Sequence, residues 1–240
     1  MTHSDLDTLF EAIDHTWPAA KITRDGVCTI RSGLGGGSRV SAATAEGVLT
    51  EDALRQAEQA MKQLGQSRLF MVRDGETELD QMLAKNGYVI KDPVHVYSAP
   101  VAQFEGDPPF LTAFTVWPPL AAQRDVWAQG GIGPERLAIM QRAKTPKISF
   151  LGRAKDRPSG TVYVAAHGPV AMLHALEVLP AARRQSLGRN LTLASARWAE
   201  RHGCTHLTLL ATKANAAANA LYSSLGMTVV GQYHYRIKPD

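Results

Sequence analysis

The sequence of 240 residues lacks several features that would assign it to a special class of protein. Its two cysteines, Cys28 and Cys204, lie far apart and match no metal-binding spacing, so we expect two free thiols in a reducing compartment and no bound metal. Nowhere do 18 apolar residues run together, and the opening residues, MTHSDLDTLFEAID, are polar and acidic, unlike a signal peptide. Like charges never form a long run, and the formal net charge of +4 is modest. The sequence therefore predicts a soluble, cytoplasmic protein with no membrane partner and no nucleic-acid partner.

What the sequence does contain is an alternation of helical and strand patterns in a chain that is 45% hydrophobic, which is enough for a buried core. Residues 147–180 contain three strand-like segments, and an amphipathic helix follows over residues 188–202. This order predicts an α/β (α+β) fold with a mixed central sheet flanked by helices. Prolines and a glycine gather in PVAQFEGDPPF, residues 100–110, which predicts a linker and divides the chain into 1–104 and 105–240.

Two stretches of the chain, residues 65–98 and 203–236, share one plan. Each begins with a glycine that ends a helix, Gly65 in the first and Gly203 in the second. A strand, a loop, a second helix closed by glycine and a last strand with aromatic residues follow in both. We interpret this as a diverged internal repeat, so the fold is expected to be present twice. Chance similarity between two common helix–strand patterns is the alternative.

Residues 178–191, VLPAARRQSLGRNL, place arginines around a tight turn before a helix. The first N–H groups of a helix lack backbone partners, and the helix dipole favours an anion in front of them. Arg183, Arg184 and Arg189 add charge and bidentate donors suited to a diphosphate, and Gly188 allows the backbone to approach a ligand closely. Alone, the pattern fits either a phosphate site or a solvated basic helix face. It matches neither a Walker loop nor a dinucleotide fingerprint.

A second glycine-rich segment, GLGGGS at residues 33–38, also suggests a phosphate loop. A phosphate loop of this kind leads directly into a helix. The residues that follow have the composition of a second strand, so the sequence predicts a flexible hairpin turn here and no phosphate site.

The arginine turn lies at a fixed distance from a second motif, N-x-x-A-x-x-L-Y-x-x-x-G, at residues 215–226. Together the two motifs resemble the GNAT acetyltransferase superfamily over roughly residues 145–236. In that family a loop of the form Q/R-x-x-G-x-G/A, here Arg183 to Gly188, binds the pyrophosphate of acetyl-CoA. Ser186 stands where the first glycine is usual. If this residue needs a positive φ, serine costs about 1 kcal/mol; if it is already helical, its hydroxyl can bond a phosphate.

The resemblance implies an N-acetyltransferase that moves an acetyl group from acetyl-CoA to a primary amine by direct attack in a ternary complex. The acceptor would be a small-molecule amine or a peptide amine, and no metal takes part. Tyr222 would lie beside the CoA sulfur as general acid, because a phenol keeps its proton at neutral pH. The residues implied to bind the cosubstrate are Leu176, Val178, Arg183, Arg184, Gln185, Ser186, Leu187, Gly188, Arg189, Asn215 and Tyr222. Among these, the backbone near Leu176 and Val178 would hold the pantetheine arm, and Asn215 would hydrogen-bond its amides.

The general base is open at this point. Glu177 is the acid nearest in sequence to the expected acetyl position and could act through water, but strand alternation leaves open whether Glu177 or Val178 faces the cleft. His174 is a second candidate. The alternative function is a non-catalytic acyl-CoA-binding sensor or partner protein.

The first half of the chain differs from the second at the positions that matter for CoA. Leu83 stands where the repeat has Tyr222, and acids precede the helix expected over residues 51–64, where they would repel a pyrophosphate. We therefore expect a degenerate GNAT-like half without a CoA site, which supplies one wall of the acceptor pocket.

Overall fold

The computed structural model describes residues 3–239, and it divides into two compact units, each built from separate parts of the chain. The larger unit contains the chain up to Trp17, together with Val96–Ala211 and Asn215–Val230. The smaller unit contains Pro18–His95, Thr212–Ala214 and the residues from Gly231 onward. The division at residues 104 and 105 that the sequence suggests remains a proposal about the two repeats.

The larger unit carries most of the main sheet. Its strands are β6 (Ala113–Val116), β7 (Lys147–Ala154), β8 (Arg157–His167), β9 (Val170–Val178) and β10 (His206–Thr212). Its helices are α1 (His3–Thr16), α5 (Ala121–Gln129), α6 (Pro134–Arg142), α7 (Leu187–Arg201) and α8 (Ala216–Ser224), with short 3-10 turns η1 (Val101–Gln103) and η2 (Pro180–Ala182).

The smaller unit contains a three-stranded antiparallel sheet, in the order β1-β2-β3, and one strand of the main sheet. Its elements are β1 (Lys21–Asp25), β2 (Cys28–Ser32), α2 (Ser38–Ser41), β3 (Thr44–Ala45), α3 (Glu51–Gln63), β4 (Leu69–Arg73) and α4 (Thr77–Lys85). Two long strands, β5 (Val89–Pro100) and β11 (Thr228–Ile237), contribute residues to both units.

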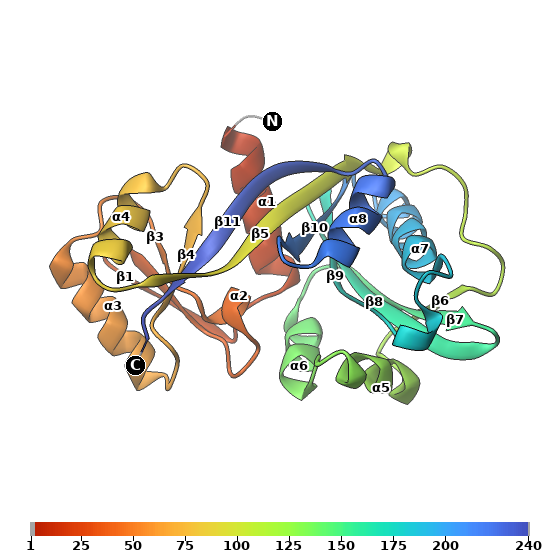
Figure 1. Ribbon diagram of the computed structural model, residues 1–240, viewed down its shortest axis with the longest axis horizontal. Coiled ribbons are helices and arrows are strands. Elements are labelled where there is room, and N and C mark those ends of the chain that lie inside the picture. Colours follow the sequence, from red (N-terminus) through yellow and green to blue (C-terminus); the bar gives the residue numbers. More distant parts are fainter. Residues whose placement is uncertain (1–2, 240) are drawn as a thin grey trace. The chain divides into compact units, whose positions relative to one another are not determined.

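The main sheet has eight strands in the order β4-β11-β5-β10-β9-β8-β7-β6 (Figure 1). Strands β9 and β10 are parallel, whereas β6 to β9 pair with one another antiparallel and β11 pairs antiparallel with β4. The predicted mixed sheet flanked by helices is therefore confirmed. One continuous sheet runs through both repeats, and the prediction that the fold is present twice stays a prediction.

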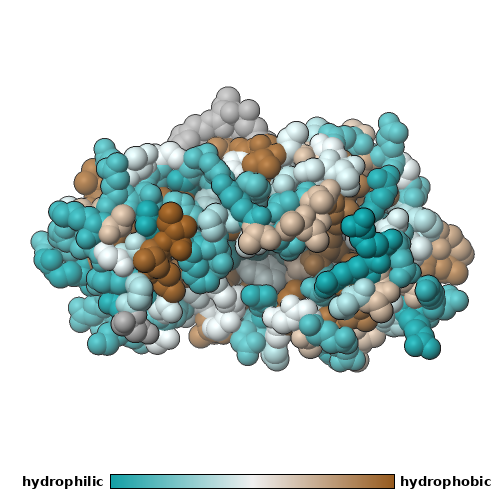
Figure 2. Space-filling model, in the orientation of Figure 1, coloured by the Kyte–Doolittle hydropathy of each residue, from teal (hydrophilic) through white to brown (hydrophobic). Residues whose placement is uncertain are grey.

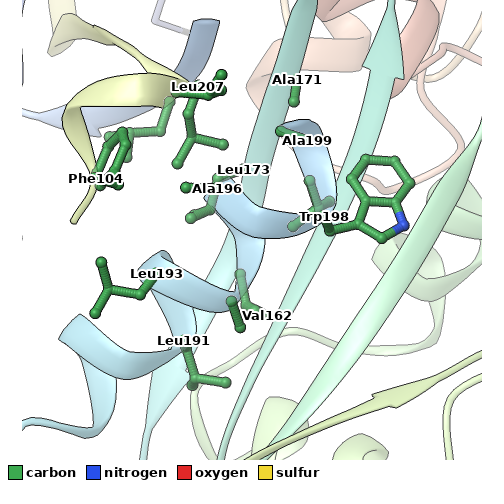
Figure 3. Close-up of a cluster of buried hydrophobic side chains, with 14 of the residues drawn as sticks. Phe104, Val162, Ala171, Leu173, Leu191, Leu193, Ala196, Trp198, Ala199 and Leu207 are labelled. Atoms are coloured by element: carbon green, nitrogen blue, oxygen red, sulfur yellow. The ribbon is translucent and has the colours of Figure 1, made fainter. Parts of the chain in front are cut away.

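Helix α7 packs on one face of this sheet because its apolar side chains recur with helical spacing. Leu191, Ala196 and Ala199 lie against Val162 and Leu173 of the sheet, all of them buried (Figure 3). Side chains alternate along β8, so Tyr163, the residue after Val162, points to the opposite face of the sheet. There its ring lies beside the ring of Trp17, the residue that follows α1. The larger unit is thus layered, with α7 on one face and α1 on the other.

The segment GLGGGS does not form the predicted hairpin turn between two strands. It is followed by the four-residue helix α2, so the prediction of a second strand directly after it is wrong. A Cβ atom at Gly33 would collide with the side chain of Ser41, and Gly35 and Gly37 have positive φ values of 79° and 94°. Glycine is needed here because the chain folds α2 tightly back on the end of β2.

The surface seen in the orientation of Figure 1 is mainly hydrophilic, and its apolar residues form several separate groups (Figure 2). The exposed large apolar side chains come from different segments and include Leu34, Val48, Ile90 and Phe110. Single exposed apolar residues are normal for a globular protein. None of the helices within residues 3–239 is long and apolar enough to cross a membrane.

Candidate functional site

The candidate site begins where two parallel strands stop pairing. The register of β9 with β10 runs from Val170 opposite His206 to Leu173 opposite Leu209. Both strands continue beyond this point, β9 to Val178 and β10 to Thr212. Their facing main-chain N–H and C=O groups lose strand partners there, and such groups need other partners. An extended ligand with amide groups could supply them.

A β-bulge marks the same place on β9. Thr161 and Tyr163 of β8 lie opposite Glu177 and His174, so one extra residue is inserted in β9. Ala175 takes up the distortion with a φ of 52°. The carbonyl of Ala175 accepts a hydrogen bond of 2.7 Å from Nε1 of Trp127, which α5 holds fully buried. The bulge is therefore fixed from the layer of helices beneath it.

Trp127 and Ala175 belong to the candidate site, although the sequence gives no sign of either. An alanine with positive φ leaves no trace in the sequence, because the left-handed conformation is a sequence signal only for glycine and, to a lesser degree, asparagine and aspartate. A tryptophan in an amphipathic helix signals burial, yet its hydrogen-bond partner in another element cannot be read from spacing. Only the strand register shows that the two residues belong to one arrangement.

The arginine turn connects the end of β9 with α7 through η2. Arg183 turns back to β9, where its Nε donates to the carbonyl of Val178 at 3.1 Å and its Nη2 lies 3.4 Å from Oε1 of Glu177. Arg184 and Arg189 are exposed and make no ion pair or side-chain hydrogen bond within residues 3–239. Two of the three arginines are therefore available to an anion in front of α7.

The first turn of α7 supplies the rest of this candidate anion site, which we call the cradle: Arg184, Arg189 and the first N–H groups of α7. Leu187 is buried and anchors the helix in the core, while the side chain of Gln185 bonds the carbonyl of Ala181 at 2.9 Å and stabilises the turn. Within the described part of the chain, the side chain of the N-cap residue, Ser186, makes no cap hydrogen bond. The N–H groups of the first turn consequently remain available, and the helix dipole favours an anion at this end.

Ser186 has the left-handed backbone conformation, with φ 62° and ψ 2°. Arg184, two residues earlier, has a φ of 61°. The first of the two alternatives for Ser186 therefore applies to the backbone, which adopts a conformation suited to glycine. A serine in this conformation costs about 1 kcal/mol relative to glycine.

Replacing Ser186 with glycine is expected to stabilise the protein by up to about 1 kcal/mol, because the left-handed strain disappears. Thermal and urea unfolding of the two proteins measure this change. The matched control is Ser223→Gly in the regular helix α8, which should destabilise because glycine lowers helix propensity. Equal destabilisation by both changes would contradict the strain at Ser186.

Helix packing favours a glycine at position 188, in addition to the predicted close approach of a ligand. A Cβ atom at this position would lie 3.1 Å from Cδ2 of Leu221, closer than most side-chain contacts. The glycine therefore lets α7 approach α8 closely at the residue before Tyr222.

Tyr222 is buried on α8, its ring 5.8 Å from the ring of Tyr97. Burial raises the pKa of Tyr222 well above that of a free phenol, so the hydroxyl keeps its proton at neutral pH. Within residues 3–239 this hydroxyl makes no hydrogen bond. Its proton is therefore available to a ligand atom that comes within reach.

Asn215 begins α8 as its N-cap residue, and its Oδ1 accepts a hydrogen bond of 3.1 Å from the N–H of Ala218. The residue is exposed. The side-chain oxygen serves the helix cap, which leaves the amide NH2 group as the part available for a ligand.

The two candidate bases have different surroundings. Glu177 is about four-fifths buried, faces Arg183, and lies against Gly130, where a Cβ atom would collide with the carboxylate. His174 is 3% exposed, hydrogen-bonded at 2.9 Å to Oγ1 of Thr16, and stacked on Trp17 with ring centroids 5.0 Å apart. His174 therefore belongs to the buried layer between α1 and the sheet, and Glu177 is the better placed acid.

A separate cavity of about 370 Å³ lies in the smaller unit, at the end of β4 and the start of α4. Asp80 lines it and bonds Arg236 at 2.7 Å and His234 at 2.8 Å, and the bond to Arg236 lowers the pKa of its carboxyl. None of the site residues that the sequence predicts lines this cavity.

Comparison with known protein families shows that residues 118–227 match the acetyltransferase (GNAT) family. Over 72 residues the chain is 36% identical to an aminoglycoside N(6')-acetyltransferase type 1 of Klebsiella aerogenes. That match covers 30% of this chain and 47% of the relative, so it spans about half the length of the curated protein.

Solved structures resemble the whole chain. A GCN5-related N-acetyltransferase from Kribbella flavida superposes with a TM-score of 0.75 at 18% identity, covering 97% of this chain and 95% of the other. A tandem GNAT protein from the clavulanic acid biosynthesis pathway gives 0.57 at 13% identity, covering 83% and 76%. At these identities the likeness shows the fold. Residues 118–227 therefore match the GNAT acetyltransferase family in sequence, and the chain has a GNAT-like fold.

Proposed function

We propose that the protein is an N-acetyltransferase that transfers the acetyl group of acetyl-CoA to a primary amine. The observation that carries the proposal is the combination of separated strands, available helix-end amides and two arginines without an ion pair in residues 3–239, all within the segment that matches the family. GNAT acetyltransferases use acetyl-CoA as cosubstrate, and this set of groups suits it. The arginines and the helix-end N–H groups can bind a pyrophosphate, and the main-chain groups of the separated strands can hydrogen-bond the amides of pantetheine.

Each residue has a defined task in the proposed reaction. Arg184, Arg189 and the first-turn amides of α7 bind the pyrophosphate, while the main chain near Leu176 and Val178 holds the pantetheine arm. The amine attacks the thioester carbonyl directly, so that a C–N bond forms and the C–S bond breaks. Tyr222 donates its proton to the leaving thiolate.

The proton lost by the amine passes to Glu177, through a water molecule, in this proposal. Arg183 keeps the carboxylate oriented toward the end of β9. Trp127 fixes the bulge at Ala175, which determines where the N–H groups of the following residues point. A donor aimed at the carbonyl oxygen stabilises the charge that develops on it during attack.

The proposed acceptor is an amine, and the relative from Klebsiella aerogenes is named as an aminoglycoside acetyltransferase. We propose small polyamines, aminoglycosides, amino acids and peptide N-termini as the classes to test. The decisive experiment incubates the purified full chain with acetyl-CoA and a panel of these amines, and measures CoA thiol release together with the mass of the product. Acetylation of at least one amine class is expected, and thiol release without an acetylated product would contradict the proposal.

A non-catalytic acyl-CoA-binding sensor is the second candidate. The ion pair of Glu177 with Arg183 favours it, because Arg183 occupies a carboxylate oxygen that a general base would need for the proton. Calorimetric titration with CoA and acetyl-CoA separates the two functions. Binding in the absence of any turnover across the amine panel would support the sensor.

We also propose that the two repeats descend from one GNAT-like unit, with residues 1–104 and 105–240 as its two copies. The element order α3-β4-α4-β5 matches α7-β10-α8-β11. Helix α3 is capped by Thr50, whose side chain accepts from the N–H of Ala53, and Glu51 and Asp52 occupy its first turn. Those acids would repel a pyrophosphate. In this proposal CoA therefore binds only at the second copy.

A further inference from the structure

Three side chains with metal-binding groups gather on the larger unit where α1 meets the end of β8, and none of them takes part in the proposed reaction. Glu11 and His15 lie one turn apart on α1, so they share one side of the helix. His167 is the last residue of β8. Their potential ligand atoms all lie within 4.8 Å of one another. We propose that Glu11, His15 and His167 form a binding site for a zinc-class divalent cation.

The distances within the cluster suit such an ion. Oε1 of Glu11 lies 3.9 Å from Nε2 of His15 and 3.4 Å from Nε2 of His167. Zinc bonds of about 2.1 Å in tetrahedral geometry place neighbouring ligand atoms about 3.4 Å apart. The two imidazole rings are stacked, with centroids 3.9 Å apart and planes 4° from parallel. Both Nε2 atoms therefore lie along the same edge of the stack, near one carboxylate oxygen, and rotation of the exposed His15 ring turns its lone pair toward the shared position.

The backbone positions of the cluster are fixed by contacts that do not use the three side chains of the cluster. At the end of α1, Oγ1 of Thr16 is hydrogen-bonded to Nε2 of His174 on β9, and Trp17 stacks on the same histidine. His167 pairs with Val170 at the turn between β8 and β9. The helix end and the strand end are thus held side by side before any metal binds, which lowers the entropy cost of forming the site.

The donor set selects among cations. Two imidazoles and one carboxylate suit zinc, nickel and copper, whereas magnesium and calcium prefer sites made of oxygen ligands. The side chains of Glu11 and His15 are 61% and 52% exposed, so the fourth position is open to water. An ion here would tie α1 to β8 on the face opposite α7.

Zinc binding by the untagged full chain tests the proposal, by competition with a chromophoric zinc chelator and by calorimetry. One saturable zinc site is expected, with magnesium failing to compete. His15→Ala, His167→Ala and Glu11→Gln should each weaken zinc binding by about 100-fold or more, since changes outside the ligand set alone cost about 10- to 100-fold. His206→Ala is the matched control, because His206, the first residue of β10, bonds Thr205 and is not a member of the cluster, so its replacement should leave zinc binding unchanged.

Thermal unfolding adds a second readout. Zinc should raise the Tm of the unmodified chain and of His206→Ala, and should leave the Tm of His15→Ala unchanged, because only a folded cluster binds the ion. If His167→Ala folds poorly, the two exposed positions on α1 carry the test. Absence of saturable zinc binding, or equal binding by the double variant Glu11→Gln/His15→Ala, would overturn the proposal.

Discussion

Replacing Tyr222 with phenylalanine is expected to lower turnover by about 100-fold or more, the usual contribution of a general acid. The affinity for CoA should stay within about threefold, because the phenyl ring keeps its packing against Tyr97. The hydroxyl has no hydrogen bond within residues 3–239, so its removal leaves no polar group unsatisfied. The change therefore separates chemistry from stability more cleanly than most tyrosine substitutions.

The measurement pairs steady-state CoA release, using the best amine of the panel, with calorimetric titration of CoA. Tyr97→Phe is the matched control, since it removes the hydrogen bond of 3.1 Å to Asn219 from the same aromatic pair. That control should cost about 1 kcal/mol of stability and leave turnover nearly unchanged. Unchanged turnover in Tyr222→Phe would remove the hydroxyl from the mechanism.

Replacing both Arg184 and Arg189 with glutamine is expected to weaken CoA binding by about 100-fold, because hydrogen bonds to charged groups contribute about 1.5–3 kcal/mol each. Neither side chain has an ion pair to lose among residues 3–239, so the folded state should keep its stability. Raising the salt concentration should weaken CoA binding by the unmodified chain more than by the variant.

Arg201→Gln provides the control for net charge. Arg201 lies in the last turn of the same helix, so the change removes one positive charge from the other end of α7. Calorimetric titration should give the same CoA affinity as the unmodified chain. If the control weakens binding as much as Arg184→Gln alone, the effect comes from overall charge, and the cradle in front of α7 is excluded.

The sequence was most informative where local pattern decides structure. The apolar spacing of α7, Gly203 after it, and the three strands within residues 147–180 were all predicted and confirmed. The two motifs that resemble the GNAT family could be found because each consists of residues that are close in sequence. The short helix α2 was missed because four residues give no periodicity, and its position depends on packing against Gly33.

The parts of the site that depend on distant contacts could not be predicted. The pairing of Trp127 with the carbonyl of Ala175 joins residues on separate elements. The sequence left His174 open as a base, and only its burial beside Thr16 and Trp17 assigns it to the layer under α1. The sequence left two backbone conformations open for Ser186, and the structure shows that its φ is left-handed.

The pairing of β11 with β4 has a consequence for synthesis of the chain. Tyr233 to Ile237 of β11 pair with Leu69 to Arg73 of β4 in the main sheet, and Arg236 bonds Asp80 of α4. Almost the whole larger unit is encoded between these two strands. On the ribosome, β4 therefore has its bridge to Ala43 but lacks its β11 partner until β11 emerges, so the smaller unit is completed last although most of it is synthesised first.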